Sequence, residues 1–200
     1  MNNGNVKNIL LCGVGGQGAI LTSKILTEGL IRAGYDVKMS EVHGMAQRGG
    51  SVSTQVRYGE KVASPLLGMG QADICVAFER MEAVRYAGYL KPDGVFIVND
   101  YRLTPMSVAV GAAEYPENAI EAISDVYKTI VIPAADIAVE TGNVRTMNVV
   151  LLGTLVKALG LDESTGADWE EIMRELIPEK LIDVNIQAFR AGLKAIDKIL

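Results

Sequence analysis

The sequence predicts an α/β domain of three layers, with a mostly parallel β-sheet, helices on both faces and a helical C-terminal part. Short apolar runs typical of buried strands alternate with segments of helical periodicity as far as Pro133, and beyond it the strand pattern stops. The chain has 200 residues, 49% of them hydrophobic, which is enough for one sizeable core. We therefore expect residues 1–200 to form a single domain.

The charge balance and the apolar pattern exclude two classes of partner. The net charge is -5 and no basic run occurs, which argues against nucleic acid as a partner. No apolar stretch approaches the roughly 18 residues of a membrane span, and the N-terminal residues lack a secretory pattern. These features predict a cytoplasmic protein that contacts neither nucleic acid nor membrane.

Cysteine and histidine are too few to form a metal centre of the usual kinds. Cys12 and Cys75 fall in predicted core strands without a CxxC pair, so we expect buried, reduced thiols. His43 is the single histidine. We therefore expect this chain to hold neither zinc nor an iron–sulfur cluster.

The first predicted strand leads into a glycine-rich turn. The apolar run Ile9–Cys12 is followed by Gly13, Gly15, Gly16, Gln17 and Gly18, in which Gly13, Gly15 and Gly18 fit G-x-G-x-x-G. Apolar residues from Ile20 to Leu30 then recur at helical spacing. Strand, turn and helix together predict a Rossmann-like unit, and its helix start is suited to a phosphate or carboxylate.

The turn by itself does not specify a dinucleotide. A ribose-binding acid is expected about 20 residues further on, and the nearest is Glu41, at the start of a polar, glycine-rich loop. Two interpretations remain open at this point. The glycines serve either a tight turn and helix packing alone, or a ligand as well.

The next elements lead into and out of that loop. The first helix should end near Gly34, and a second strand should cover Asp36–Ser40. The loop Glu41–Gly50 holds His43, Gly44, Gln47, Arg48, Gly49 and Gly50. Ser51–Tyr58 then alternates polar and apolar residues, which predicts a half-exposed antiparallel strand.

The rest of the chain supplies further strands and then helices. We expect buried strands at Ile74–Phe78, Val95–Val98 and Thr129–Ile132, helices at Met81–Leu90 and Asn118–Val126, and a turn at Lys91–Gly94. Helices should follow at 136–140, 144–158, 170–176 and 182–200. The apolar stripe of the last one should pack on the sheet or on a second chain.

Ligands of open α/β sheets bind beyond the carboxyl ends of the strands, where several of these features fall. Arg48 is suited to binding an anion, or else pairs with a carboxylate of the loop or of a partner. His43 is an acid or base, or a surface or interface histidine. Asn148 is a buried hydrogen-bonding residue or a partner contact. No catalytic residue is predicted, which indicates a component of a larger assembly.

Several motifs together resemble one family. They are GVGGQG at Gly13–Gly18, EVHGMAQRGGSV at Glu41–Val52, Arg57, Asp73 with VAFE at Val76–Glu79, LKPDGVFIVN at Leu90–Asn99, RTMNVVLLG at Arg145–Gly153 and IPEKLIDVNIQAFRAG at Ile177–Gly192. The chain resembles the gamma-type subunits of 2-oxoacid:ferredoxin oxidoreductases over essentially its whole length. Within that family it is most similar to the small beta subunits of indolepyruvate:ferredoxin oxidoreductases.

The resemblance implies a role in oxidative decarboxylation. An aryl pyruvate and coenzyme A would yield an aryl-acetyl-CoA, carbon dioxide and reduced ferredoxin. It implies a large alpha subunit as partner, which carries thiamine diphosphate, magnesium and iron–sulfur clusters, with no cofactor in this chain. Ferredoxin would be reached through the complex, and the isolated chain could form a homodimer.

Three alternatives remain open. The first is a gamma subunit for pyruvate, 2-oxoisovalerate or 2-oxoglutarate. The second is a free-standing oxidoreductase that binds NAD or FAD through Gly13–Gly18, and the third is a non-enzymatic assembly module.

Overall fold

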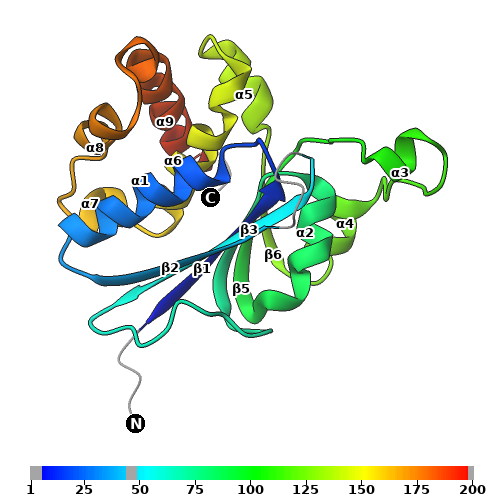
Figure 1. Cartoon of the computed structure of the whole chain (residues 1–200), viewed down its shortest axis with the longest axis horizontal. Coiled ribbons are helices and arrows are strands. Elements are labelled where there is room, and N and C mark those ends of the chain that lie inside the picture. Colours follow the sequence, from blue (N-terminus) through cyan, green and yellow to red (C-terminus); the bar gives the residue numbers. More distant parts are fainter. Residues whose placement is uncertain (1–5, 44–48, 198–200) are drawn as a thin grey trace.

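The computed structural model describes residues 6–43 and 49–197, which form a six-stranded sheet flanked by helices (Figure 1). The strand order is β2-β3-β1-β4-β5-β6. Of these strands, only β3 runs against the others, so the prediction of a mostly parallel sheet is confirmed. The strands are β1 (Lys7–Val14), β2 (Asp36–His43), β3 (Ser51–Gly59), β4 (Ala72–Ala77), β5 (Leu90–Asn99) and β6 (Lys128–Ile132).

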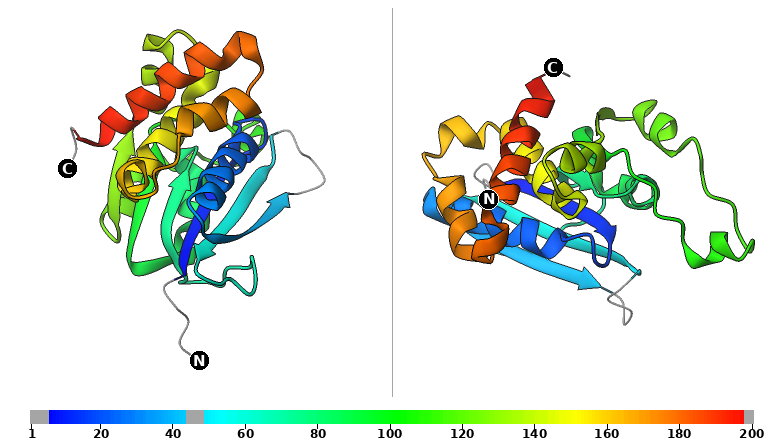
Figure 2. Two further views of the ribbon diagram at one scale, coloured as in Figure 1. Left: turned by 90° about the vertical axis from the view of Figure 1, so that its left-hand side faces the viewer. Right: turned by 90° about the horizontal axis from the view of Figure 1, so that it is seen from above.

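Helices cover both faces of the sheet, as Figure 2 shows from two sides. On one face lie α1 (Ala19–Arg32), α5 (Ala134–Glu140), α6 (Met147–Ala158), α7 (Leu161–Ser164), α8 (Trp169–Leu176) and α9 (Ile182–Asp197). On the other face lie α2 (Arg80–Tyr86) and α4 (Ala119–Ser124). Short helices also occur at α3 (Met106–Ala109), η1 (Ala87–Tyr89), η2 (Val144–Thr146) and η3 (Glu179–Leu181).

Alternation along the central strands divides the core into two clusters. Leu11 and Val76 face the larger helical layer, whereas Cys12 and Cys75 face α2 and α4. Because successive side chains of a strand point to opposite faces, continuous apolar runs are required where both faces are covered. This requirement explains why the central strands could be predicted from the sequence.

The C-terminal helix packs on another helix of the same chain. A Cβ at Gly192 in α9 would lie 2.0 Å from the Val150 carbonyl oxygen of α6, and a Cβ at Gly153 would lie 2.2 Å from the Phe189 carbonyl oxygen. Glycine at both positions therefore permits the close crossing. Ile186, Phe189 and Ile196 are buried there, so the apolar stripe as far as Asp197 needs neither the sheet nor a second chain.

The region around the second strand differs from the prediction. Glu41–His43 belongs to β2 and not to a loop, because these residues continue the pairing with Val52–Thr54 of β3. The predicted antiparallel pairing of β3 is confirmed, but β3 is buried on both faces. Gln55 is 6% exposed, and its Oε1 accepts a hydrogen bond from the Leu67 amide at 2.6 Å. A loop that follows β3 thus covers its polar side.

The predicted helix Met81–Leu90 is also shorter than expected. α2 ends at Tyr86, η1 follows, and β5 already begins at Leu90. The expected turn at Lys91–Gly94 therefore lies inside the irregular start of β5, where the register to β4 shifts. An ion pair of 2.5 Å between Lys91 Nζ and Asp73 Oδ1 joins this part of β5 to β4, which a local turn pattern does not reveal.

Candidate functional site

Two glycine-rich segments that are far apart in the sequence meet at the carboxyl edge of the sheet. The Gly15 amide donates to the Gly50 carbonyl at 2.8 Å, and the Gly49 amide donates to the Gly15 carbonyl at 3.2 Å. The turn Gly13–Gly18 and the start of α1 are therefore fixed against the segment that leads into β3. This confirms that the two predicted regions lie at one edge.

A cavity of about 360 Å³ lies between this turn, the start of α1, the end of β2 and the start of β3. Its wall includes Gly16, Ile20, Glu41, Val42 and His43. Ile20 is 49% exposed and Val42 50% exposed, so the mouth of the cavity is partly apolar. Such a mixed wall suits a ligand with both a polar and an apolar part, or a side chain of a partner.

Glu41 is not placed as in a dinucleotide-binding unit. In that unit the acidic residue ends the strand beside the first one. Here β3 lies between β1 and β2, and Glu41 is paired with Thr54 of β3. The inserted antiparallel strand β3 therefore separates the strand of Glu41 from the strand that leads into the glycine turn. In a dinucleotide-binding unit these two strands are direct neighbours.

A second cavity, of about 260 Å³, lies on the other side of the glycine turn, and Gly16 and Gly18 line both cavities. Arg145 supplies the charged side chain among the described residues of its wall, and Asn143 and Asn185 add polar groups. Sequence reasoning did not select Arg145 as a site residue. The sequence did contain a signal for Arg145, because a cation just before the start of a helix such as α6 interacts unfavourably with the helix dipole. Its presence there therefore indicates a role other than stabilising the helix.

Two glycines of the turn have clear structural reasons. A Cβ at Gly13 would lie 2.9 Å from both Gln17 Oε1 and Phe78 Cβ. Gly18 has φ 84°, and a Cβ there would lie 2.6 Å from Asn148 Nδ2. Close packing and backbone conformation therefore require glycine at Gly13 and Gly18 whether or not a ligand binds.

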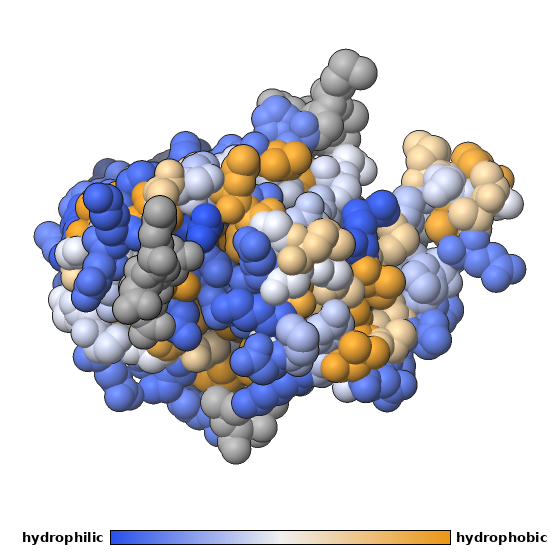
Figure 3. Space-filling view, turned by 90° about the horizontal axis from the view of Figure 1, so that it is seen from below, coloured by the Kyte–Doolittle hydropathy of each residue, from blue (hydrophilic) through white to orange (hydrophobic). Residues whose placement is uncertain are grey.

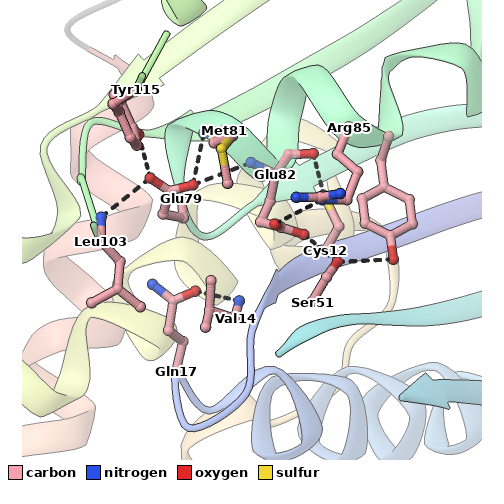
Figure 4. Close-up of polar contacts among 11 residues, drawn as sticks. Cys12, Val14, Gln17, Ser51, Glu79, Met81, Glu82, Arg85, Leu103 and Tyr115 are labelled. Carbon is pink, nitrogen blue, oxygen red and sulfur yellow. Dashed lines mark hydrogen bonds and ion pairs between the residues drawn. The ribbon is translucent and has the colours of Figure 1, made fainter. Parts of the chain in front are cut away.

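The side chain of Gln17 is used inside the turn. Its Oε1 accepts from the Val14 amide at 2.7 Å (Figure 4). Its Nε2 donates to the Phe78 carbonyl at 3.1 Å. Asn148, from α6, is likewise buried and donates from Nδ2 to the Gly18 carbonyl at 3.3 Å. Asn148 is thus a buried hydrogen-bonding residue, and a contact of Asn148 with a partner stays a prediction.

Glu79 is a fully buried carboxylate at the end of β4. Its Oε2 accepts from the Met81 and Glu82 amides at 2.7 and 3.2 Å, which caps α2. Its Oε1 accepts from the Leu103 amide at 3.2 Å and from the Tyr115 hydroxyl (Figure 4). Burial and the bond to Glu79 raise the pKa of Tyr115 above its usual range. The carboxylate therefore joins three segments of this chain.

Asn99 and Asp100 also hold this edge together. Asn99 donates from Nδ2 to the Phe78 carbonyl at 3.2 Å, and its Oδ1 accepts from the Ala134 amide at 3.0 Å. Asp100 forms an ion pair with Arg80. These residues thus connect the ends of β4 and β5 with the starts of α2 and α5.

The two thiols lie below this edge. Cys12 and Cys75 are buried and free, as predicted, with 3.8 Å between their sulfur atoms. Burial raises the pKa of Cys12 well above its usual value, so this thiol is kept protonated and is a poor nucleophile. Beside them, the buried carboxylate of Glu82 accepts from Ser51 Oγ and from Arg85 Nε.

The described residues include some of the predicted site residues and no metal centre. Gly44, Gln47 and Arg48 lie outside the described residues. Within residues 6–43 and 49–197, no group of three or more His, Cys, Asp or Glu could hold a metal ion. In the same ranges, no helix has the length and apolar character needed to cross a membrane.

Comparison with known proteins identifies the family. The model of the pyruvate ferredoxin/flavodoxin oxidoreductase family matches residues 8–195. The chain belongs to this family. The chain is also 39% identical to the indolepyruvate oxidoreductase subunit IorB of Pyrococcus horikoshii over 199 residues, which are 96% of this chain and 97% of that protein. The predicted resemblance is thereby confirmed.

A solved structure and a longer relative add to the comparison. The structure is the gamma subunit of a keto/oxoacid ferredoxin oxidoreductase from Geobacter sulfurreducens, with a TM-score of 0.70, 25% identity and coverage of 96% of this chain and 99% of that one. The ketoisovalerate oxidoreductase subunit VorA of Methanothermobacter thermautotrophicus is 30% identical, covering 92% of this chain but only 35% of that protein. In that family member, the matched region is about a third of the polypeptide.

Proposed function

We propose that this chain is the small subunit of an indolepyruvate:ferredoxin oxidoreductase, with residues 1–200 acting as one gamma-type domain. The complex would convert an aryl pyruvate and coenzyme A into an aryl-acetyl-CoA and carbon dioxide, with reduction of ferredoxin. The observation that carries the proposal is the 39% identity to an IorB subunit over nearly the whole length of both chains.

In this proposal the redox chemistry belongs to the large alpha subunit, which holds thiamine diphosphate, magnesium and the iron–sulfur clusters. The small subunit stays without a cofactor and acts in the cytoplasm as part of the hetero-oligomer. The hydrogen bonds at the sheet edge support a structural role for this subunit. The side chains of Glu79, Gln17 and Asn99 bond to other segments of this chain and so fix the shape of the edge.

We further propose that the glycine loops receive an anionic group of coenzyme A or of the 2-oxoacid, or else contact the large subunit. Gly16 and Gly18 line both cavities, so an extended molecule could cross the turn from one to the other. The residues proposed for this site are Gly13, Gly15, Gly16, Gln17, Gly18, His43, Gly44, Gln47, Arg48, Gly49, Gly50 and Asn148.

Arg48 separates the two proposed roles of the loop. If its guanidinium binds the anion, Arg48→Ala should raise the Michaelis constant of the assembled enzyme for coenzyme A or the 2-oxoacid. Loss of a charge-assisted hydrogen bond costs about 1.5–3 kcal/mol, or about ten- to a hundred-fold. If Arg48 instead holds the subunit interface, assembly should weaken while the constants of the remaining complex stay unchanged.

Co-purification tests the function itself. A tagged chain expressed in its native host should retain a large subunit that contains thiamine diphosphate and iron. That complex should reduce a viologen dye with indolepyruvate faster than with pyruvate, 2-oxoisovalerate or 2-oxoglutarate, and the isolated chain should not reduce it. A preference for another 2-oxoacid would reassign the substrate.

Two results would argue for the other functions. Activity of the isolated chain, or a rise of its melting temperature with NAD or FAD, would favour a free-standing oxidoreductase, because a ligand of the folded state stabilises it. Association with a large subunit that lacks oxidoreductase activity would favour an assembly module.

A further inference from the structure

The segment Tyr101–Asn118, here called the arm, projects from the body between β5 and α4. Its short helix α3 lies at the periphery in both Figure 1 and Figure 2, away from the sheet and from the large helical layer. The outer part exposes apolar side chains: Met106 is 76% exposed and Val110 is 68% exposed. In Figure 3 this part forms a separate lobe at the upper right with apolar residues on its surface.

The base of the arm, in contrast, is firmly bonded. Glu79 Oε1 accepts from the Leu103 amide and from the Tyr115 hydroxyl, one on each side of α3. Arg102 forms an ion pair of 2.6 Å with Glu117, and its guanidinium lies 4.3 Å from the centre of the Tyr115 ring. Both ends of the arm are thus fixed to each other and to the end of β4, which holds α3 outward.

The outer part of the arm carries no charge. Residues 103–113 read LTPMSVAVGAA, whereas 22% of the whole chain is charged. A four-residue helix such as α3 gains little stability from its own hydrogen bonds. Exposed Met106 and Val110 would lose unfavourable contact with water if another surface covered them. The arm therefore has the properties of a docking element.

The nature of the occupant follows from charge and from the longer relative. At the base, Arg102 and Glu117 pair with each other and Glu114 is exposed, whereas residues 103–113 carry no charge, so the outer part matches an uncharged apolar surface. In VorA the matched region is about a third of the polypeptide, so in that relative the domain is accompanied by other parts of the same oxidoreductase subunit.

We propose that the arm inserts Met106 and Val110 into an uncharged apolar groove on the large subunit of the oxidoreductase. This proposal rests on the proposed function. Its most direct test is the dissociation constant between the purified large subunit and variants of this chain.

Val110→Asp should be compared with Val126→Asp as a matched control. Val126 has the same residue type and the same exposed fraction of 68%, but it lies between α4 and β6, outside the arm. Because interface centres are dominated by a few buried apolar anchors, Val110→Asp and Met106→Asp should each weaken association at least about 30-fold. Val126→Asp should change it less than about threefold, with equal melting temperatures of all three free variants.

Equal affinity of Val110→Asp and Val126→Asp for the large subunit would overturn the arm proposal while the proposed function stands. Failure of the unmodified chain to bind any large subunit would refute the proposed function, and the arm proposal with it. If the isolated chain dimerises in sedimentation, and Val110→Asp abolishes only that dimer, the occupant is a second copy and the proposal is wrong.

Discussion

Replacement of Glu79 by glutamine tests whether one buried carboxylate organises the carboxyl edge of the sheet. All of its four hydrogen bonds come from donors: the amides of Met81, Glu82 and Leu103 and the hydroxyl of Tyr115. The substitution keeps the shape but replaces one acceptor oxygen by an NH₂ donor. The better orientation of the amide keeps its oxygen on α2 and turns its nitrogen toward Leu103 and Tyr115.

The size of the effect follows from that orientation. The Tyr115 hydroxyl can rotate and accept, but the Leu103 amide loses its acceptor, which costs about 1–3 kcal/mol for a buried group. Loss of negative charge at the start of α2 adds about 0.3–1 kcal/mol, and relief of the buried charge offsets part of the sum. We expect a net loss of about 2–3 kcal/mol, or a fall in Tm of about 4–12 °C.

Urea unfolding followed by circular dichroism measures this free energy, with Glu117→Gln as a control. This control is the same Glu→Gln substitution at an exposed ion pair, where we expect the free energy of unfolding to change by less than about 1 kcal/mol. Tyr115→Phe should cost less than Glu79→Gln, because it removes one bond only. If Glu79→Gln and Glu117→Gln have the same stability, the carboxylate does not hold this edge together.

Three further predictions concern the turn and the titratable groups. Gly16→Ala should lower the free energy of unfolding by about 1–2 kcal/mol, because Gly16 has a left-handed backbone conformation. Gly18→Ala should lower it by about 1 kcal/mol more, because the added Cβ meets the side chain of Asn148. Equal losses of the two variants in urea unfolding would contradict this prediction. Burial raises the pKa of Tyr58 to about 12, so its contribution to stability is complete below about pH 10 and is lost from there to pH 12. The free energy of unfolding should therefore fall less for Tyr58→Phe than for the native chain as the pH rises from 8 into the alkaline range. An identical pH profile of the two proteins would refute this prediction. The bond from Lys38 and the Val62 amide lower the pKa of Asp36 below 3.8, so its contribution is present above that pH and is lost as pH falls further. Asp36→Asn should remove this acid-side loss, and unchanged acid unfolding midpoints would show that Asp36 plays no part.

Local pattern was sufficient where both faces of a strand are covered. The runs at Ile74 and Val95 could be predicted because a strand between two helical layers needs apolar residues on both sides. The strand, turn and helix around Gly13–Gly18 could be predicted because glycine punctuation and helical spacing are local signals. The family followed from several motifs together, since each one alone is common.

The same local signals failed where distant segments supply the partner. The alternation in β3 predicted an exposed face, but the loop through Leu67 covers it and satisfies Gln55. The proline–glycine pattern at Lys91–Gly94 predicted a turn, but the bond to Asp73 draws the segment into β5.

What the sequence determined by itself, therefore, is the order of the elements, the two-sided apolar core and the family. The tertiary structure alone decided that β3 lies between β1 and β2, that α9 crosses α6 at Gly153 and Gly192, and that Arg145 lines one cavity with Gly16 and Gly18. The physical reason is that periodicity states which face of an element is apolar, whereas pairing and helix crossing depend on shape and on hydrogen-bond partners many residues away.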